Sequence, residues 1–139
     1  MEEIITFARK VGFNKIGLAF CIGLRREASQ LNRILKDNSF EAISVTCKTG
    51  SVPKEHLGLK EEEKLKPNYF EAMCNPVARA GLLNSQTTDL NVVLGLCVGH
   101  DALFIRYSNA PTTVPAAKDR ALAYNPLGAL YAWHYLQQC

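Results

Sequence analysis

The stretch KIGLAFCIGLRREASQLNRILKDNSFEAISVTC, residues 15–47, decides the fold. Its first seven residues, 15–21, are mostly apolar without clean alternation, which is typical of a strand covered on both faces. Its last seven, 41–47, are rich in β-branched residues and indicate a second strand. Between them, apolar residues recur at helical spacing among charged ones at Leu24, Ala28, Leu31 and Leu35. The stretch therefore predicts a strand–helix–strand unit, whose two strands pair in parallel.

The flanking sequence supplies further helices and strands. Residues 2–12 have helical spacing and end at a glycine, and residues 91–97 repeat the apolar pattern of the first strand. Residues 112–117 are a weaker strand, which we place at an edge because Pro115 cannot donate to a ladder. Two Asn-Pro pairs, Asn75-Pro76 and Asn125-Pro126, predict helix starts, because asparagine caps a helix and proline suits its first turn.

These elements predict one α/β domain over residues 1–139. We expect a three-layer, Rossmann-like open sheet of about four mostly parallel strands with helices on both faces. Residues 16–20, 42–46 and 92–96 should form its centre. The lysine- and glutamate-rich residues 48–67 are expected to be a loop or a solvated helical turn.

Composition excludes several classes of protein. The chain is 47% hydrophobic and 21% charged, and no apolar run approaches the roughly 20 residues that span a bilayer. The acidic start MEEII does not match a secretory signal, so we expect a cytoplasmic protein that does not bind membranes. The net charge of +3 is spread along the chain, which argues against a nucleic-acid partner.

Cysteines carry the strongest functional signal. Cys21, Cys47 and Cys97 each end a predicted strand, and ligands of open parallel sheets bind outside the carboxyl ends of the strands. Cys74 comes just before the helix at Asn75-Pro76, whose N-terminal partial charge should lower the pKa of this thiol. Four thiols from distant segments are therefore predicted to share one crevice. Cys139, the last residue, is interpreted as a bystander.

A histidine extends the candidate set. His100 follows Cys97 by three residues across Gly99, so the two side chains can face one ion, with Asp101 either orienting the imidazole or capping the next helix. His134 is interpreted as a helix-face residue. The predicted metal ligands are Cys21, Cys47, Cys74, Cys97 and His100.

Three functions remain open at this level. Thiolates suit zinc or an iron–sulfur cluster, and the cluster is slightly favoured because the ligands come from separate loops rather than a compact knuckle. No Cys-x-x-Cys occurs, so the local signature of a zinc ribbon or a redox dithiol is absent. The alternative is a thiol redox enzyme or switch that uses Cys97 with His100 or with Cys47. A third possibility is a module that binds a small polar ligand or cofactor through residues in loops near the strand ends: Lys48, Asn75, Lys118 and Arg120.

Several segments resemble an uncharacterised family of small, cysteine-rich, predicted metal-binding proteins of anaerobic bacteria and archaea. The resemblance rests on AFCIGL at 19–24, VTCK at 45–48, MCNP at 73–76, GLCVGHD at 95–101, KDR at 118–120 and NP at 125–126. It implies metal binding without a known reaction, and an anaerobic origin again favours iron. Relatives tend to have histidine where this chain has Tyr124. Many also carry an N-terminal cysteine-rich segment, so the resemblance implies that any second site there is missing here.

Overall fold

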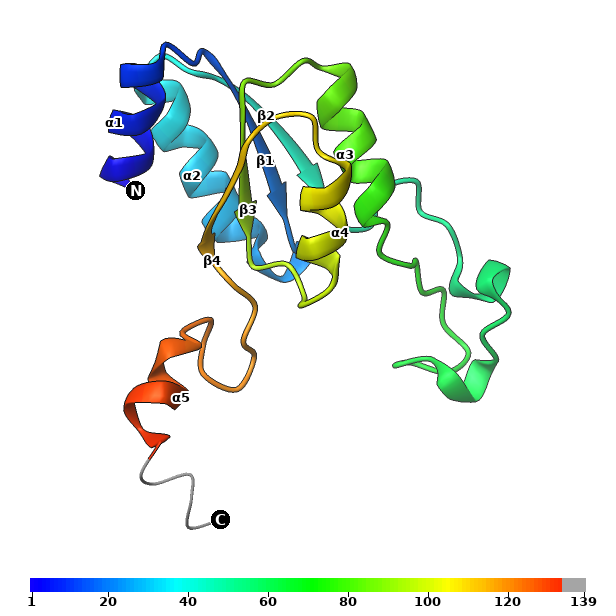
Figure 1. The fold of residues 1–139 in the computed structure, drawn as a ribbon. Helices are drawn as coiled ribbons and strands as arrows, with labels where there is room; N and C mark the ends of the chain where they lie inside the picture. Colours follow the sequence, from blue (N-terminus) through cyan, green and yellow to red (C-terminus); the bar gives the residue numbers. More distant parts are fainter. Residues whose placement is uncertain (134–139) are drawn as a thin grey trace.

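The computed structural model describes residues 1–133, and its centre is a four-stranded sheet (Figure 1). The strands are β1 (Lys15–Phe20), β2 (Glu41–Thr46), β3 (Leu90–Leu94) and β4 (Thr112–Ala116). All three pairings are parallel, and the strand order is β2-β1-β3-β4. The predicted Rossmann-like open sheet is therefore confirmed.

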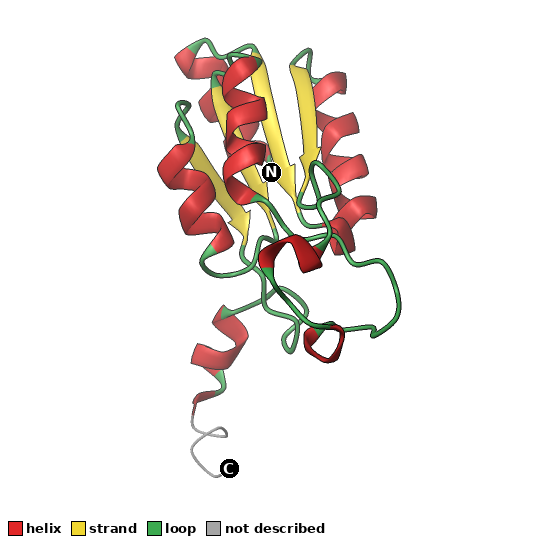
Figure 2. Cartoon of the chain, turned by 90° about the vertical axis from the view of Figure 1, so that its right-hand side faces the viewer, coloured by secondary structure: helices red, strands yellow, loops and turns green. Residues whose placement is uncertain are grey.

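The four main helices cover both faces of the sheet (Figures 1 and 2). They are α1 (Glu2–Val11), α2 (Arg25–Asp37), α3 (Pro76–Ser85) and α4 (His100–Tyr107). Buried residues of α1 and α2 pack with Ile16 and Leu18 of β1, whereas those of α3 and α4 pack with Ala19. Successive residues of β1 thus serve opposite cores, which explains why its sequence is apolar without alternation.

The position of β2 differs from the prediction. We expected residues 42–46 at the centre of the sheet, but β2 is an edge strand, and its residues are half-buried or exposed. The crossover from β2 through α3 carries β3 to the far side of β1, so β1 and β3 form the centre. The polar residues Glu41 and Ser44 are exposed in β2, as an edge allows. The edge position of β4 was predicted correctly.

Between β2 and α3 the chain makes a long excursion, residues 48–74, with two short 3₁₀ turns at Lys54–Leu57 and Glu61–Glu63. It is a loop, as expected, but Lys64 is not solvated: it is 7% exposed and pairs with Glu55 and with Glu61. An isolated antiparallel bridge between Pro53 and Ala72 closes the base of the excursion. Its two ends, Cys47 and Cys74, are thereby brought together.

Both Asn-Pro pairs precede helices, but only the first asparagine acts as a cap. Asn75 Oδ1 accepts a hydrogen bond from Ala78 N at 2.9 Å, whereas Asn125 makes no side-chain cap to α5 (Leu127–Tyr131). The predictions for His134 and Cys139 lie outside the described residues.

Replacing Asn75 by Ala should lower the free energy of unfolding by about 1 kcal/mol, because Ala78 N loses its acceptor. Urea unfolding followed by circular dichroism measures the change. Asn125→Ala is the matched control and should shift stability by less than about 0.5 kcal/mol. Equal losses in the two variants would contradict the capping role of Asn75.

Within residues 1–133, no helix combines the length and the apolar composition that crossing a membrane requires.

Candidate cysteine site

Cys21 and Cys47 lie next to each other at the carboxyl ends of β1 and β2. The parallel register pairs Phe20 with Thr46, so the residues that follow, Cys21 and Cys47, leave the sheet side by side. Both are buried, with 7% and 3% of their surfaces exposed. Cys47 Sγ accepts a hydrogen bond from Ile22 N at 3.4 Å, which ties the two segments together.

Cys74 and Cys97 approach this pair from the side of α3 and α4. Asn75 N donates to Cys47 O at 3.0 Å and holds Cys74 against the buried cluster that contains Cys21 and Cys47. Cys97 does not end β3 as predicted, because β3 stops at Leu94 and the chain turns at Gly95, where φ is +62°. Cys97 is half-buried in the turn that follows, and negative charge on it would raise the pKa of Cys74.

Three of the four thiols share one buried cluster. Cys21 and Cys47 belong to it, Cys74 packs against it, and Lys118 Nζ donates to Cys21 Sγ at 3.0 Å. Cys21, Cys47 and Cys74, which are 53 residues apart from first to last in the sequence, are thus brought together by the fold, whereas a site shared with Cys97 stays a prediction. Among residues 1–133, however, no three Cys, His, Asp or Glu side chains are already grouped as ligands of one metal ion.

Lys118 distinguishes Cys21 from the other thiols. Burial alone would raise the pKa of Cys21, but the hydrogen bond from Lys118 Nζ at 3.0 Å, a hydrogen bond from the Gly23 backbone and the lysine charge lower this pKa below its usual value. Burial would lower the pKa of Lys118, but its bonds to Cys21 and Cys97 raise it. The pair is therefore predisposed to be thiolate and ammonium.

Cys74 behaves in the opposite way to our prediction. Burial raises its pKa, and the neighbouring Cys47 and Cys97 raise it further, because a second negative charge beside them is unfavourable. The N-terminus of α3 was expected to lower this pKa. That expectation is wrong, since burial and the neighbouring thiols leave the pKa of Cys74 raised.

Arg79 is a residue of this region that the sequence reasoning missed. It lies on α3, is 0% exposed, and its Nε, Nη1 and Nη2 atoms have no hydrogen-bond partner within residues 1–133. Its guanidinium carbon stands 5.9 Å from the centre of the Phe104 ring. A signal was present in the sequence, because Arg79 falls on the same helical stripe as Pro76, Ala80 and Leu83, where an apolar residue is the rule.

The remaining predicted residues have other contacts. The His100 imidazole makes no hydrogen bond within residues 1–133, while its backbone N donates to Cys97 O at 2.9 Å. Asp101 Oδ1 accepts from Gly99 N and Ala102 N at 3.0 and 2.8 Å, so it caps α4 and does not orient the histidine.

Of the four residues predicted to bind a small ligand, only Lys118 joins the cysteines. Lys48 Nζ donates to Ala72 O at 3.0 Å, Asn75 caps α3, and Arg120 is exposed in the segment after β4.

That segment returns over the carboxyl ends of the central strands. The Tyr124 ring lies 3.0 Å from where a Cβ on Gly95 would stand, and its hydroxyl lies 3.7 Å from the corresponding point on Gly23. The point on Gly23 is also 3.9 Å from Cys21 Sγ. The tyrosine that departs from the resembled family thus lies beside the cysteines.

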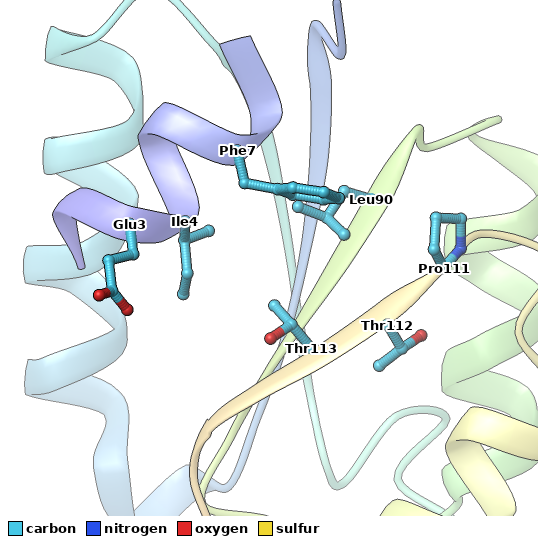
Figure 3. A pocket seen from close by; sticks show the side chains of 7 residues that line it. All are labelled: Glu3, Ile4, Phe7, Leu90, Pro111, Thr112 and Thr113. Atoms are coloured by element: carbon cyan, nitrogen blue, oxygen red, sulfur yellow. The ribbon is translucent and has the colours of Figure 1, made fainter. Parts of the chain in front are cut away.

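A cavity of about 390 Å³ lies elsewhere, between α1 and the amino ends of β3 and β4. Figure 3 shows Phe7 extending from α1 towards Leu90 of β3, with Thr112 and Thr113 of β4 nearby. Among the described residues that line it, Glu3 alone is charged. We assign no chemistry to it.

The fold and the site together define a Rossmann-like α/β protein in which Cys21 and Cys47 follow the carboxyl ends of two neighbouring strands, with Cys74 packed against them and Lys118 bonded to Cys21. The chain belongs to the family of proteins of unknown function called DUF1847, whose signature matches residues 1–114. An uncharacterised protein of the archaeon Methanocaldococcus jannaschii is 47% identical over 138 residues, which cover 99% of this chain and 69% of that protein. Kinship with an uncharacterised family that has archaeal members is therefore confirmed, while its metal-binding character stays a prediction.

A solved structure is also similar in part. The crystal structure of the anabolic ornithine carbamoyltransferase from Campylobacter jejuni aligns with a TM-score of 0.45 at 10% identity, over 96% of this chain. This chain spans 41% of that one.

Proposed function

We propose that this protein binds a metal ion or an iron–sulfur cluster through Cys21, Cys47, Cys74 and Cys97. The observation that supports this is the buried cluster of Cys21, Cys47 and Cys74, with Lys118 donating to Cys21 at 3.0 Å and with Cys97 half-buried in the turn before α4. Free cysteines are common in cores, where they act as small apolar residues. A purely apolar role does not require a neighbouring cation, whereas a thiolate is stabilised by one. His100, at the first turn of α4, stays a prediction as a further ligand.

An iron–sulfur cluster is the favoured occupant and zinc the alternative. Four thiolates satisfy both. Structural zinc sites usually take their cysteines in closely spaced pairs, whereas these four come from the ends of β1 and β2, from the turn before α3 and from the turn before α4.

The test is to purify the protein without oxygen and measure its bound elements and its absorption spectrum. We expect stoichiometric iron with sulfide, or zinc. Cys97→Ser should lose the metal with little change in circular dichroism, because Cys97 is half-buried in a turn. A wild-type protein that retains no metal, and takes none up from added iron, sulfide, cobalt or zinc, would overturn the proposal.

One observation favours the thiol redox alternative. The Lys118–Cys21 contact at 3.0 Å identifies Cys21, rather than Cys97, as the thiolate that would react, with Cys47 beside it as its partner. In that case an added disulfide reagent would accept two electrons from Cys21 and Cys47, which would release two protons and form one disulfide. Alkylation followed by mass spectrometry would detect fast loss of the two thiols together in the metal-free protein.

A further inference from the structure

Arg79 is in an environment that is unfavourable for a lone cation. A charged side chain removed from water costs several kcal/mol unless it is paired and hydrogen-bonded, and a guanidinium does not lose its proton in proteins. Arg79 is fully buried, yet none of its three nitrogen atoms has a hydrogen-bond acceptor within residues 1–133. The face of Phe104 offers only a weak attraction in return.

Arg79 lies next to the cysteine cluster, because its guanidinium carbon stands 5.9 Å from the centre of the Phe104 ring, and Phe104 packs in one buried cluster with Cys21 and Cys47. Burial lowers the pKa of its guanidinium, and negative charge on Cys47, Cys74, Cys21 and Cys97 raises it. Within residues 1–133, the ion pairs of carboxylates involve other cations, and none involves Arg79. The cysteine sulfur atoms, when ionised, are therefore the groups that could balance the charge of Arg79.

Thiols compensate a cation only when they are ionised. A free cysteine has a pKa of about 8.5 and is mostly neutral at neutral pH. Binding of a soft metal removes the thiol protons and converts the whole set to thiolates. Four thiolates around a dicationic centre leave two negative charges, and Arg79 and Lys118 together supply two positive ones.

We propose that Arg79 is the buried counter-charge of the thiolate-bound centre and donates hydrogen bonds to its sulfur atoms. This inference rests on the proposed metal-binding function and deepens it. It defines the occupant by charge: a divalent ion, or a cluster core of the same charge, held by four thiolates. Hydrogen bonds to sulfur and nearby charge are also the means by which proteins set the potential of a cluster.

Removing the charge of Arg79 should have opposite effects on the metal-bound and the metal-free protein. With metal bound, a neutral side chain at position 79 leaves the excess negative charge uncompensated, so affinity falls. Without metal, the same substitution removes a lone buried cation, so the fold loses nothing. A residue that merely fills space against Phe104 would affect both states alike.

Titration with Co²⁺ under anaerobic, reducing conditions tests this, because thiolate-to-cobalt charge-transfer absorption reports binding through sulfur. For Arg79→Met we expect an affinity for Co²⁺, measured by competition with a chelator, that is lower by at least about tenfold, as for the loss of an outer-shell partner. Arg79→Lys keeps the charge and should lie between Met and the wild type. The urea midpoint of metal-free Arg79→Met should equal or exceed that of the wild type.

Each other outcome decides against the proposal. Equal Co²⁺ affinity in wild type and Arg79→Met would overturn the role of Arg79 while leaving the proposed function intact. A metal-free Arg79→Met protein that is less stable, or does not fold, would show a packing role instead. Failure of the wild type to bind Co²⁺, iron or zinc through sulfur would overturn both the function and this inference.

Discussion

Cys47→Ser should remove metal binding altogether, lowering the affinity for Co²⁺ by more than about a hundredfold, beyond the loss expected from an outer-shell change. Cys47 lies in the same buried cluster as Cys21, and Cys74 packs against that cluster, where Asn75 N donates to Cys47 O at 3.0 Å. It is 3% exposed, so water cannot readily replace it as a ligand. A serine hydroxyl does not ionise at neutral pH and is a poor ligand for a soft metal. The charge-transfer absorption on Co²⁺ titration measures the loss.

Cys139→Ser provides the matched control. It makes the same chemical change at the fifth cysteine, which the sequence predicts to be a bystander, and it should bind Co²⁺ as the wild type does. Circular dichroism checks that Cys47→Ser keeps the fold, for which we expect a cost of about 1–2 kcal/mol from placing a hydroxyl in a buried site. Undiminished binding by a folded Cys47→Ser protein would reject Cys47 as a ligand.

The architecture could be predicted because the sequence of residues 15–47 shows every part of a parallel strand–helix–strand unit. A parallel strand–helix–strand unit needs an apolar strand, an amphipathic helix and a second strand, and all three patterns are explicit there. Once two strands are parallel, their carboxyl ends share an edge, so the meeting of Cys21 and Cys47 followed from topology alone. The capping role of Asn75 could also be predicted, since a cap is an interaction between residues close in the sequence.

What could not be predicted depends on contacts between distant segments. The order of strands decides whether β2 is central or at an edge, and no local pattern specifies on which side of β1 the strand β3 will pair. The pKa of Cys74 is raised by burial and by the neighbouring Cys47 and Cys97, which the local sequence around Asn75-Pro76 does not show. Lys118 lies 97 positions after Cys21 in the sequence, and only the path of the segment that follows β4 brings the two side chains together.

The burial of Arg79 could not be predicted for a different reason. An arginine within an apolar stripe can point its charge to the surface by extending its long side chain, so its position alone does not predict burial. The thiols that would favour a buried cation at this position come from other elements of the fold, so the sequence of α3 alone does not show them. The conflict between local pattern and residue type was nonetheless visible, and such conflicts are expected at functional sites.

Gly95→Ala should destabilise the protein by roughly 2–4 kcal/mol, from a left-handed backbone and overpacking together. Gly95 ends β3 with a φ of +62°, and a Cβ there would stand 2.2 Å from Leu24 Cδ1 and 3.0 Å from the Tyr124 ring. Leu24 belongs to the core beneath α2, so it cannot move without loss of packing. Urea unfolding measures the effect.

Two other glycines separate the causes. Gly12→Ala has a similar backbone, with φ of +84°, but open space around it, so it should cost only about 1–2 kcal/mol. Gly81→Ala lies within α3, meets nothing within 4 Å, and should stabilise the protein by about 0.5–1 kcal/mol. If Gly95→Ala cost no more than Gly12→Ala, the close packing of Tyr124 over the strand ends would be wrong. Because that tyrosine and Lys118 belong to the same returning segment, a Gly95→Ala protein should also bind Co²⁺ less tightly than Gly12→Ala, as its displaced ring loosens the lysine from Cys21.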